Sequence, residues 1–294
     1  MSTQIEGARI LVCGGTGSLG QHIVHRLLAM EPEAVTVFSR DEKKQADMRR
    51  EIEDSRLRFV VGDIRDRLRI REALDGIDLV INAAALKHVP ICEEAPTEAV
   101  LTNVMGATNI RLAALAAGVR TVLVISTDKA VKPVNVLGMT KAIQERVILA
   151  PTSAGHSTRF LAVRYGNVLG SRGSVVPVFC DCVLRGKPLP ITDPTMTRFI
   201  LTLDEAADLI LTALELGVPG ELWVRRSPAV YIGDLAQAVA LGLGASRAYP
   251  VRDVGIRPGE KMHEVLVSAE EKMYARTDAD CFRIMRDYAD DPRA

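Results

Sequence analysis

The chain has 294 residues, 48% of them hydrophobic, and its 37 basic side chains balance 37 acidic ones. This length allows one large or two medium domains around a buried core, and the balanced charge argues against a general attraction to nucleic acid or to an anionic membrane. No apolar stretch approaches the roughly 20 residues that a membrane-spanning helix needs, and the N-terminus lacks the basic and apolar regions of a signal peptide.

The chain opens with a strand, a glycine-rich turn and a helix. Gly14, Gly17 and Gly20 follow the apolar run Ile10–Val12, a helix is expected from His22, and a second strand-like segment, Ala34–Phe38, completes a βαβ unit. A lone glycine triplet also fits an ordinary turn, but in this context it predicts a dinucleotide site in which backbone N–H groups and a helix N-terminus meet a pyrophosphate. The expected contacts from this turn are Gly14, Thr16, Gly17, Ser18, Leu19 and Gly20.

Further strands and helices alternate along the first half. The predicted strands are Arg9–Cys13, Ala34–Phe38, Leu57–Gly62, Asp78–Ala84, Thr121–Ser126 and Phe160–Tyr165, and the clearest predicted helix is Glu98–Ala117. Such alternation is typical of parallel pairing, so we expect an α/β fold with a doubly wound parallel sheet of the Rossmann type. In this fold the ligand lies across the carboxyl ends of the strands, where the strand order reverses.

From about Arg172 the alternation loosens. We expect a dinucleotide-binding domain over 1–171 and a smaller substrate-binding lobe over 172–294, in which 204–224 packs back on the sheet. Asp204 is expected to cap a helix over Glu205–Leu216. The five cysteines are scattered, and the close pair Cys180 and Cys182 indicates a helix face more than a metal site. We expect no metal and a cytoplasmic protein.

The end of the second strand bears on the choice of nicotinamide cofactor. Arg40 is placed to pair with a 2′-phosphate, Ser39 avoids repelling it, and Lys44 adds positive charge, so NADP is expected. Asp41 could still hold the ribose diol of NAD. Asp63 and Ile64, after the third strand, and Ala83, Ala84 and Ala85, after the fourth, are expected to lie along the cofactor.

The fifth strand runs into Ser126, Thr127, Asp128 and Lys129. An acid and a potential base therefore stand at the carboxyl edge of the sheet, beside the expected nicotinamide. Lys141, twelve residues after Lys129, is expected to start a helix. An Asp-Lys dipeptide alone is usually a surface ion pair, and it is the position at the end of a strand that indicates catalysis.

Eight segments together carry a resemblance to a known family. They are Gly14–Gly20, Ser39–Glu42, Ala83–Pro90, Asn103–Gly106, Ser126–Ala130, Arg164–Val168, Met196–Phe199 and Gly255–Lys261. In this order they resemble the polysaccharide-biosynthesis (CapD/CapE-like) branch of the extended short-chain dehydrogenases, which contains UDP-N-acetylglucosamine 4,6-dehydratases. The resemblance extends from about Arg9 to Ile284, and it is to the short type that lacks an N-terminal membrane region.

The resemblance implies a reaction and a set of roles. Hydride leaves C4 of the sugar for NADP⁺, Lys129 removes the C5 proton, Asp128 protonates the departing C6 hydroxyl, and the hydride returns to C6. Thr127 and Lys141 complete the implied catalytic group, and Lys141 also holds the nicotinamide ribose. This scheme needs a neutral lysine and a protonated aspartate, so proton sharing within the pair is the natural description. The resemblance also implies cofactor contacts from Lys87 and Asn103, and UDP-sugar contacts from Lys87, Asn167, Val176, Arg198, Arg257 and Glu260.

One position departs from the family pattern. Most short-chain dehydrogenases have a tyrosine four residues before the helix lysine, and this chain has Leu137 there. Leucine cannot carry a proton, so the base for the C4 hydroxyl is unassigned. Two alternatives stay open, namely a nucleotide-sugar 4-epimerase or 4-ketoreductase on the same fold, and a non-catalytic NADP-binding sensor. A homo-oligomer is also expected.

Overall fold

Strands and helices alternate through the first half of the computed structural model, which describes residues 4–153, 155–246, 248–278 and 280–285. The strands are β1 (Arg9–Cys13), β2 (Ala34–Ser39), β3 (Leu57–Val61), β4 (Leu79–Asn82), β5 (Thr121–Ile125) and β6 (Arg159–Arg164). The helices between them are α1 (Ser18–Leu28), α2 (Glu42–Glu51), α3 (Arg67–Ala73), α4 (Val89–Glu94), α5 (Pro96–Ala99), η1 (Val100–Met105), α6 (Gly106–Ala117), η2 (Asp128–Ala130) and α7 (Val136–Leu149). Every strand predicted in this half is present, with small differences at the ends.

One large sheet organises the molecule. Its nine strands lie in the order β13-β14-β10-β6-β5-β4-β1-β2-β3, and all pairings from β10 to β3 are parallel. β1 pairs with both β2 and β4, so the chain turns back beside β1 and opens a crevice at the carboxyl ends of β1 and β4. The fold is therefore the expected doubly wound, Rossmann-like α/β fold.

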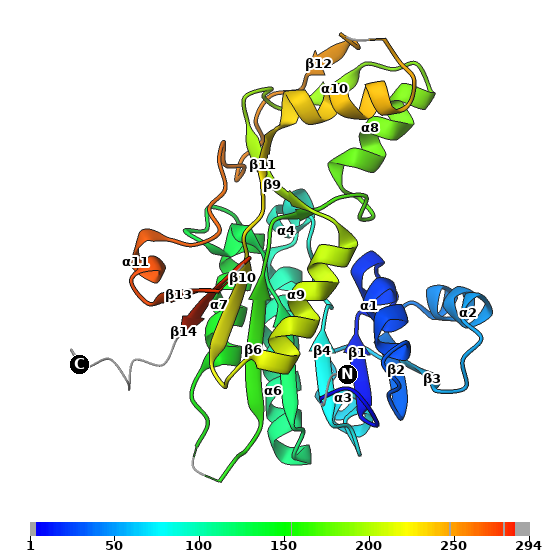
Figure 1. Cartoon of the computed structure of the whole chain (residues 1–294), viewed down its shortest axis with the longest axis vertical. Helices are drawn as coiled ribbons and strands as arrows, with labels where there is room; N and C mark the ends of the chain where they lie inside the picture. Colours follow the sequence, from blue (N-terminus) through cyan, green and yellow to red (C-terminus); the bar gives the residue numbers. More distant parts are fainter. Residues whose placement is uncertain (1–3, 154, 247, 279, 286–294) are drawn as a thin grey trace.

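Alternating side chains of the central strands enter two separate cores. In β1, Ile10 and Val12 pack with residues of α1 and α9, whereas Leu11 and Cys13 pack with residues of α3 and α6. This follows from the two-residue period of a strand, which sends successive side chains to opposite faces. Figure 1 shows the result, with α1 and α9 on one face of the sheet and α6 and α7 on the other.

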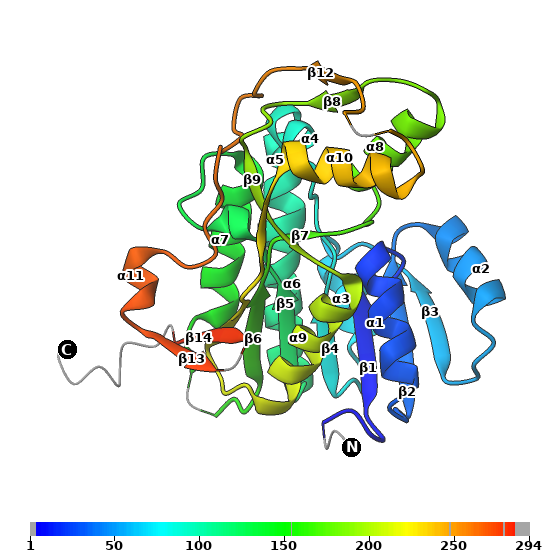
Figure 2. The same cartoon turned by 45° about the horizontal axis from the view of Figure 1, so that its top comes forward.

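The chain after β6 is divided between the sheet and a lobe beyond its end. Its elements are β7 (Asn167–Val168), α8 (Val175–Leu184), β8 (Leu189–Ile191), β9 (Thr197–Leu201), α9 (Leu203–Leu216), β10 (Glu221–Arg225), β11 (Ala229–Tyr231), α10 (Ile232–Gly242), β12 (Val251–Asp253), α11 (Ala269–Lys272), β13 (Ala275–Asp278) and β14 (Cys281–Met285). β10, β13 and β14 extend the large sheet, with β13 and β14 antiparallel. α8 and α10 pack together in the lobe, and Figures 1 and 2 show it above the carboxyl ends of the strands.

Three predicted helix starts were wrong. α1 begins at Ser18, four residues before the expected His22, directly after the N-cap Gly17. α9 is capped by Thr202, whose hydroxyl accepts from the Glu205 N–H while the Glu205 carboxylate accepts from the Thr202 N–H. This reciprocal capping box satisfies two backbone donors at once, and Asp204 instead pairs with His22 of α1 at 3.0 Å. α7 begins at Val136 because the Asn135 side chain caps it, so Lys141 lies inside the helix.

The predicted helix over Glu98–Ala117 is longer and less regular than expected. A π-helical stretch, η1, interrupts it between α5 and α6. The continuous stretch Pro96–Ala117 has 22 residues and is apolar enough to cross a membrane by length and composition, so the statement that no such stretch exists was wrong. Half of its most apolar window is buried inside the protein.

Candidate active site

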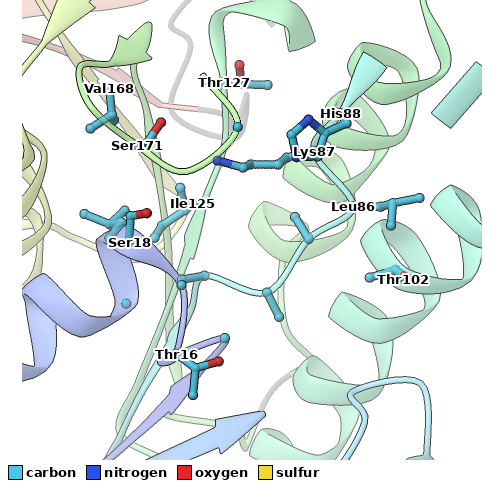
Figure 3. Close-up of a pocket in the computed structure, with 18 of the residues that line it drawn as sticks. Thr16, Ser18, Leu86, Lys87, His88, Thr102, Ile125, Thr127, Val168 and Ser171 are labelled. Atoms are coloured by element: carbon cyan, nitrogen blue, oxygen red, sulfur yellow. The ribbon is translucent and has the colours of Figure 1, made fainter. Parts of the chain in front are cut away.

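A cavity of about 620 Å³ opens along the carboxyl ends of the parallel strands. Its wall is built from the β1–α1 turn, the ends of β2, β4, β5 and β6, and the loop that follows β6. Figure 3 shows the Lys87 side chain extending across this opening, between Thr127 and Ser18, toward the loop that carries Ser171. Residues from both halves of the chain therefore face one space.

The glycine turn folds so tightly that side chains at two of its glycines would collide with the protein backbone. Gly14 has φ +74°, and a Cβ there would lie 2.7 Å from the Ala84 backbone nitrogen. A Cβ on Gly20 would collide with the Gly14 carbonyl oxygen. Gly17 is the N-cap of α1 and makes no side-chain cap, so the first N–H groups of the helix face the cavity. This arrangement suits a pyrophosphate, and all six residues predicted in the turn line the cavity.

At the end of β2, the Arg40 side chain is exposed to the cavity, whereas the Asp41 carboxylate is paired with Lys44. The Asp41 carboxylate accepts from the Lys44 N–H at 3.0 Å and pairs with the Lys44 ammonium, and this pairing lowers the pKa of Asp41. Arg40 is 55% exposed, lines the cavity, and has its guanidinium 3.4 Å from the Asp63 carboxylate. The Ser39 hydroxyl is hydrogen-bonded to Thr16 at 2.8 Å. Arg40 is thus an exposed cation at this edge of the cavity, where its ion pair is with Asp63.

Asp63 is held ionised by arginines. Burial opposes ionisation, but hydrogen bonds from Arg65 and the nearby Arg40 lower the pKa of Asp63. Asp63, Ile64, Ala83, Ala84 and Ala85 all line the cavity, as do Ser39, Arg40 and Lys44.

Asn103 lies behind the wall. Its side chain is fully buried, accepts from the Leu86 N–H at 2.8 Å, and donates to the Leu86 carbonyl and the Thr140 hydroxyl, each at 3.0 Å. By bonding both backbone groups of Leu86, the Asn103 side chain fixes the conformation of the loop after β4. Lys87 does line the cavity, and burial together with the nearby Arg172 lowers its pKa.

The Thr127–Asp128–Lys129 segment forms a connected group at the end of β5. Asp128 Oδ1 accepts from the Thr127 hydroxyl at 2.9 Å and from the Lys129 ammonium at 3.0 Å. Asp128 is completely buried, and its Oδ2 has no hydrogen-bond partner among the described residues. Thr127 and Lys129 line the cavity while Asp128 does not. The Asp128 carboxyl group is therefore connected to the cavity by its hydrogen bonds with Thr127 and Lys129.

Lys141 reaches the same space from α7. Its ammonium donates to the Ile125 carbonyl and to the Gln144 side chain, both at 2.8 Å. Burial lowers the pKa of Lys141 to about 8, with Glu145 and Cys92 opposing that shift. Leu137, one turn earlier, is 4% exposed and lines the cavity where a tyrosine would present its hydroxyl.

The residues assigned to the UDP-sugar are dispersed. Asn167 lines the cavity, and its buried Oδ1 lacks a hydrogen-bond partner among the described residues. Val176, Arg198, Arg257 and Glu260 do not line it. One guanidinium nitrogen of Arg198 donates to the carbonyls of Thr197, Lys261 and Met262. Arg257 is exposed, and its backbone N–H donates to the Glu260 carboxylate at 3.2 Å.

Two contributors were missed by sequence reasoning. Glu264 places Oε1 3.7 Å from the Lys129 ammonium, from a loop 135 residues away. The backbone N–H of Arg172 donates to the Ser18 hydroxyl at 3.0 Å, which ties the loop after β6 to the glycine turn. Glu264 follows the distinctive segment Gly255–Lys261 by three residues, which was the only sequence signal that it belongs to the site. Nothing in the neighbouring sequence indicated that its carboxylate would lie near Lys129.

Comparisons with known proteins agree with this geometry. UDP-glucose 4-epimerase of Rickettsia prowazekii is 43% identical over 288 residues, which cover 96% of this chain and 84% of that protein. The structure of Pen from Bacillus thuringiensis has a TM-score of 0.93 at 36% identity, covering 96% of this chain and 90% of that one. DesIV, a dTDP-glucose 4,6-dehydratase from Streptomyces venezuelae solved with NAD and TYD bound, has a TM-score of 0.80 at 26% identity, covering 90% of each chain.

Within the described residues, no three His, Cys, Asp or Glu side chains gather as a metal ion would require.

The family described as "Polysaccharide biosynthesis protein" matches residues 10–286. With a Rossmann-like sheet and relatives named for reactions of nucleotide sugars, the chain belongs to this polysaccharide biosynthesis family within the extended short-chain dehydrogenases.

Proposed function

We propose that this protein is an NADP-dependent 4,6-dehydratase of a UDP-N-acetylhexosamine. The observation that carries the proposal is the Thr127–Asp128–Lys129 group, in which an acid and a base are joined at the edge of the cavity. Removing water from C5 and C6 needs one group to take a proton and another to give one. Interconversion at C4 alone needs no acid for a departing hydroxyl.

The cavity fits the cofactor, since Gly14 and Gly20 let the turn fold tightly against the backbone and the uncapped N-terminus of α1 borders the cavity. A nicotinamide held there would supply a hydride acceptor for C4 of the sugar and a hydride donor for C6. The buried Lys141 supplies a positive charge and hydrogen-bond donors beside the expected ribose.

The protein's own groups balance the protons. The Thr127 hydroxyl takes the C4 hydroxyl proton while passing its own to Asp128, along the 2.9 Å hydrogen bond. Once Asp128 carries the C4 proton, Lys129 releases its ammonium proton to solvent and can then remove the C5 proton. Asp128 returns its proton through Thr127 to the C6 oxygen, which leaves as water. Lys129 then gives the C5 proton back to C5 and takes a proton from solvent. This relay supplies the step that Leu137 cannot perform, and it leaves every group as it began.

The preference for NADP rests on the end of β2. Asp41 is committed to Lys44, so the carboxylate that would favour NAD is already paired. Arg40 is exposed beside Ser39, and its guanidinium matches a phosphate in charge and shape.

A 4-epimerase is the second candidate, because relatives 42–43% identical to this chain carry the name UDP-glucose 4-epimerase. An epimerase would use the same oxidation at C4 without loss of water. The wall around Thr127 and Lys129 would then only hold the sugar.

One NMR time course with UDP-N-acetylglucosamine and NADP⁺ in deuterated water separates the candidates. A dehydratase yields a 4-keto-6-deoxy product that has lost one water and carries deuterium at C5. An epimerase yields the C4 epimer of unchanged mass. Tight NADP binding with no product from any UDP-sugar would overturn both and favour a sensor protein.

A further inference from the structure

Four charged side chains from two distant segments meet beside the cavity. The Lys129 ammonium lies 3.0 Å from Asp128 Oδ1 and 3.7 Å from Glu264 Oε1, and Glu264 Oε2 lies 3.2 Å from the Lys261 ammonium. The side chain of Asp128 is completely buried and that of Glu264 is 2% exposed. The order along the cluster is carboxylate, ammonium, carboxylate, ammonium.

The loop that carries Glu264 and Lys261 is fixed in place. The Lys261 ammonium donates to the Val131 carbonyl at 2.7 Å, just after η2. The Asn135 side chain donates to the Gly259 carbonyl at 2.7 Å, and a Cβ on Gly259 would lie 2.9 Å from Asn135 Cβ. Glu264 and Lys261 do not line the cavity, so any effect on substrate passes through Lys129.

Charge balance decides what this cluster does. When all four groups are ionised, the charges sum to zero. When Asp128 carries a proton and Lys129 has lost its own, Glu264 and Lys261 still balance each other, and no buried charge is left alone. A buried carboxylate without Lys261 would need Lys129 to stay protonated, since an uncompensated buried charge is strongly unfavourable.

We propose that Glu264 and Lys261 form a positioning pair that holds Lys129 in place and lets it give up its proton without leaving a buried charge unbalanced. The use of Lys129 as the C5 base rests on the proposed dehydratase function, whereas its control by this pair does not.

The first test is the pH dependence of kcat/KM for dehydration. In Lys261→Met, Glu264 holds the proton on Lys129, so the acidic limb moves to higher pH by about one unit, the scale of a charge within a few ångströms. In Glu264→Gln, Lys261 repels the protonated Lys129, and the limb moves to lower pH by a similar amount. The double variant loses both charges and returns toward the wild-type profile. Shifts in the same direction, or lower rates with an unmoved profile, would overturn the proposal.

Other titratable groups around Lys129 stay unchanged in these variants. They are Asp128 on η2, Lys141 on α7, Tyr165 after β6, and Lys87 and His88 across the cavity. Burial raises the pKa of Tyr165, so it stays neutral. The matched control is the exposed pair Lys132 and Glu270, 3.5 Å apart. Lys132→Met, Glu270→Gln and their double variant should leave the profile in place, and a shift there as large as in the buried pair would overturn the assignment.

The second test needs no activity. Trace acetylation of the substrate-free protein by acetic anhydride, read by mass spectrometry for Lys129 against the 81%-exposed Lys43, follows the neutral fraction of Lys129 with pH. Lys261→Met should delay labelling of Lys129 to higher pH, and Glu264→Gln should advance it. If the wild type shows no dehydration, the proposed function fails while this labelling still decides the role of the pair. Lys261→Met decides it alone if Glu264→Gln does not fold, and unchanged labelling refutes it.

Discussion

Replacing Arg40 with alanine should weaken NADP binding and leave NAD binding nearly unchanged. In the free protein the Arg40 guanidinium lies 3.4 Å from the Asp63 carboxylate, and Arg40 loses this ion pair when it binds the phosphate of NADP. Such an exposed pair contributes about 0–1 kcal/mol. A charge-assisted hydrogen bond to the 2′-phosphate contributes about 1.5–3 kcal/mol. The difference of about 0.5–3 kcal/mol corresponds to a loss of roughly 2- to 160-fold in NADP affinity.

Calorimetric titration of both cofactors measures this difference. The matched control is Arg65→Ala, since Arg65 pairs with the same Asp63 carboxylate at 2.7 Å but does not line the cavity. That variant should change NADP and NAD affinity equally. Equal losses for both cofactors in Arg40→Ala, or tighter binding of NAD than NADP by the wild type, would refute the reasoning.

Asp128→Asn and Lys129→Ala should each cut dehydratase turnover by about 10²-fold or more, the scale of a positioned acid or base, while calorimetry still detects NADP and UDP binding. Near-normal turnover in either would show that the relay is misplaced. Leu137→Ala should keep activity within a modest factor because the leucine only fills space, and a pH–rate profile of Leu137→Tyr should show an added titrating group; inactivity of a folded, cofactor-binding Leu137→Ala would reveal a specific role. Between pH 8 and 10.5 a smaller fraction of Lys141 is protonated in the folded protein than in the unfolded protein. Its contribution to the free energy of unfolding therefore rises with pH across that window, by up to about 3 kcal/mol. Urea unfolding at several pH values should show this rise in the wild type relative to Lys141→Met, and parallel curves would contradict the buried lysine. Light scattering should find a homo-oligomer, and a monomer at all concentrations would end that expectation.

Much of the fold could be predicted because its signals are local. The two-residue period of the strands, the glycines of the first turn and the polar residues after β5 each report on a short stretch of backbone. Parallel strands bring their carboxyl ends to one edge, so local predictions at Gly17, Arg40, Ala84 and Thr127 converge on one cavity.

What could not be predicted depends on contacts between distant segments. Nothing near Glu264 in the chain indicates that it lies against Lys129, and nothing near Cys281–Met285 indicates that β14 joins the large sheet beside β10. The guanidinium of Arg198, assigned to a diphosphate, has one nitrogen committed to three backbone carbonyls.

The class of fold, the glycine turn after β1 and the polar segment Thr127–Lys129 after β5 could therefore be predicted from the sequence, because each is encoded within one element and its adjoining turn. The tertiary structure decided which charges surround Lys129, that Asn103 supports the cavity wall from behind, and that Asp128 meets the cavity only through Thr127 and Lys129. Those outcomes follow from packing and charge balance across the whole chain, which no local pattern contains.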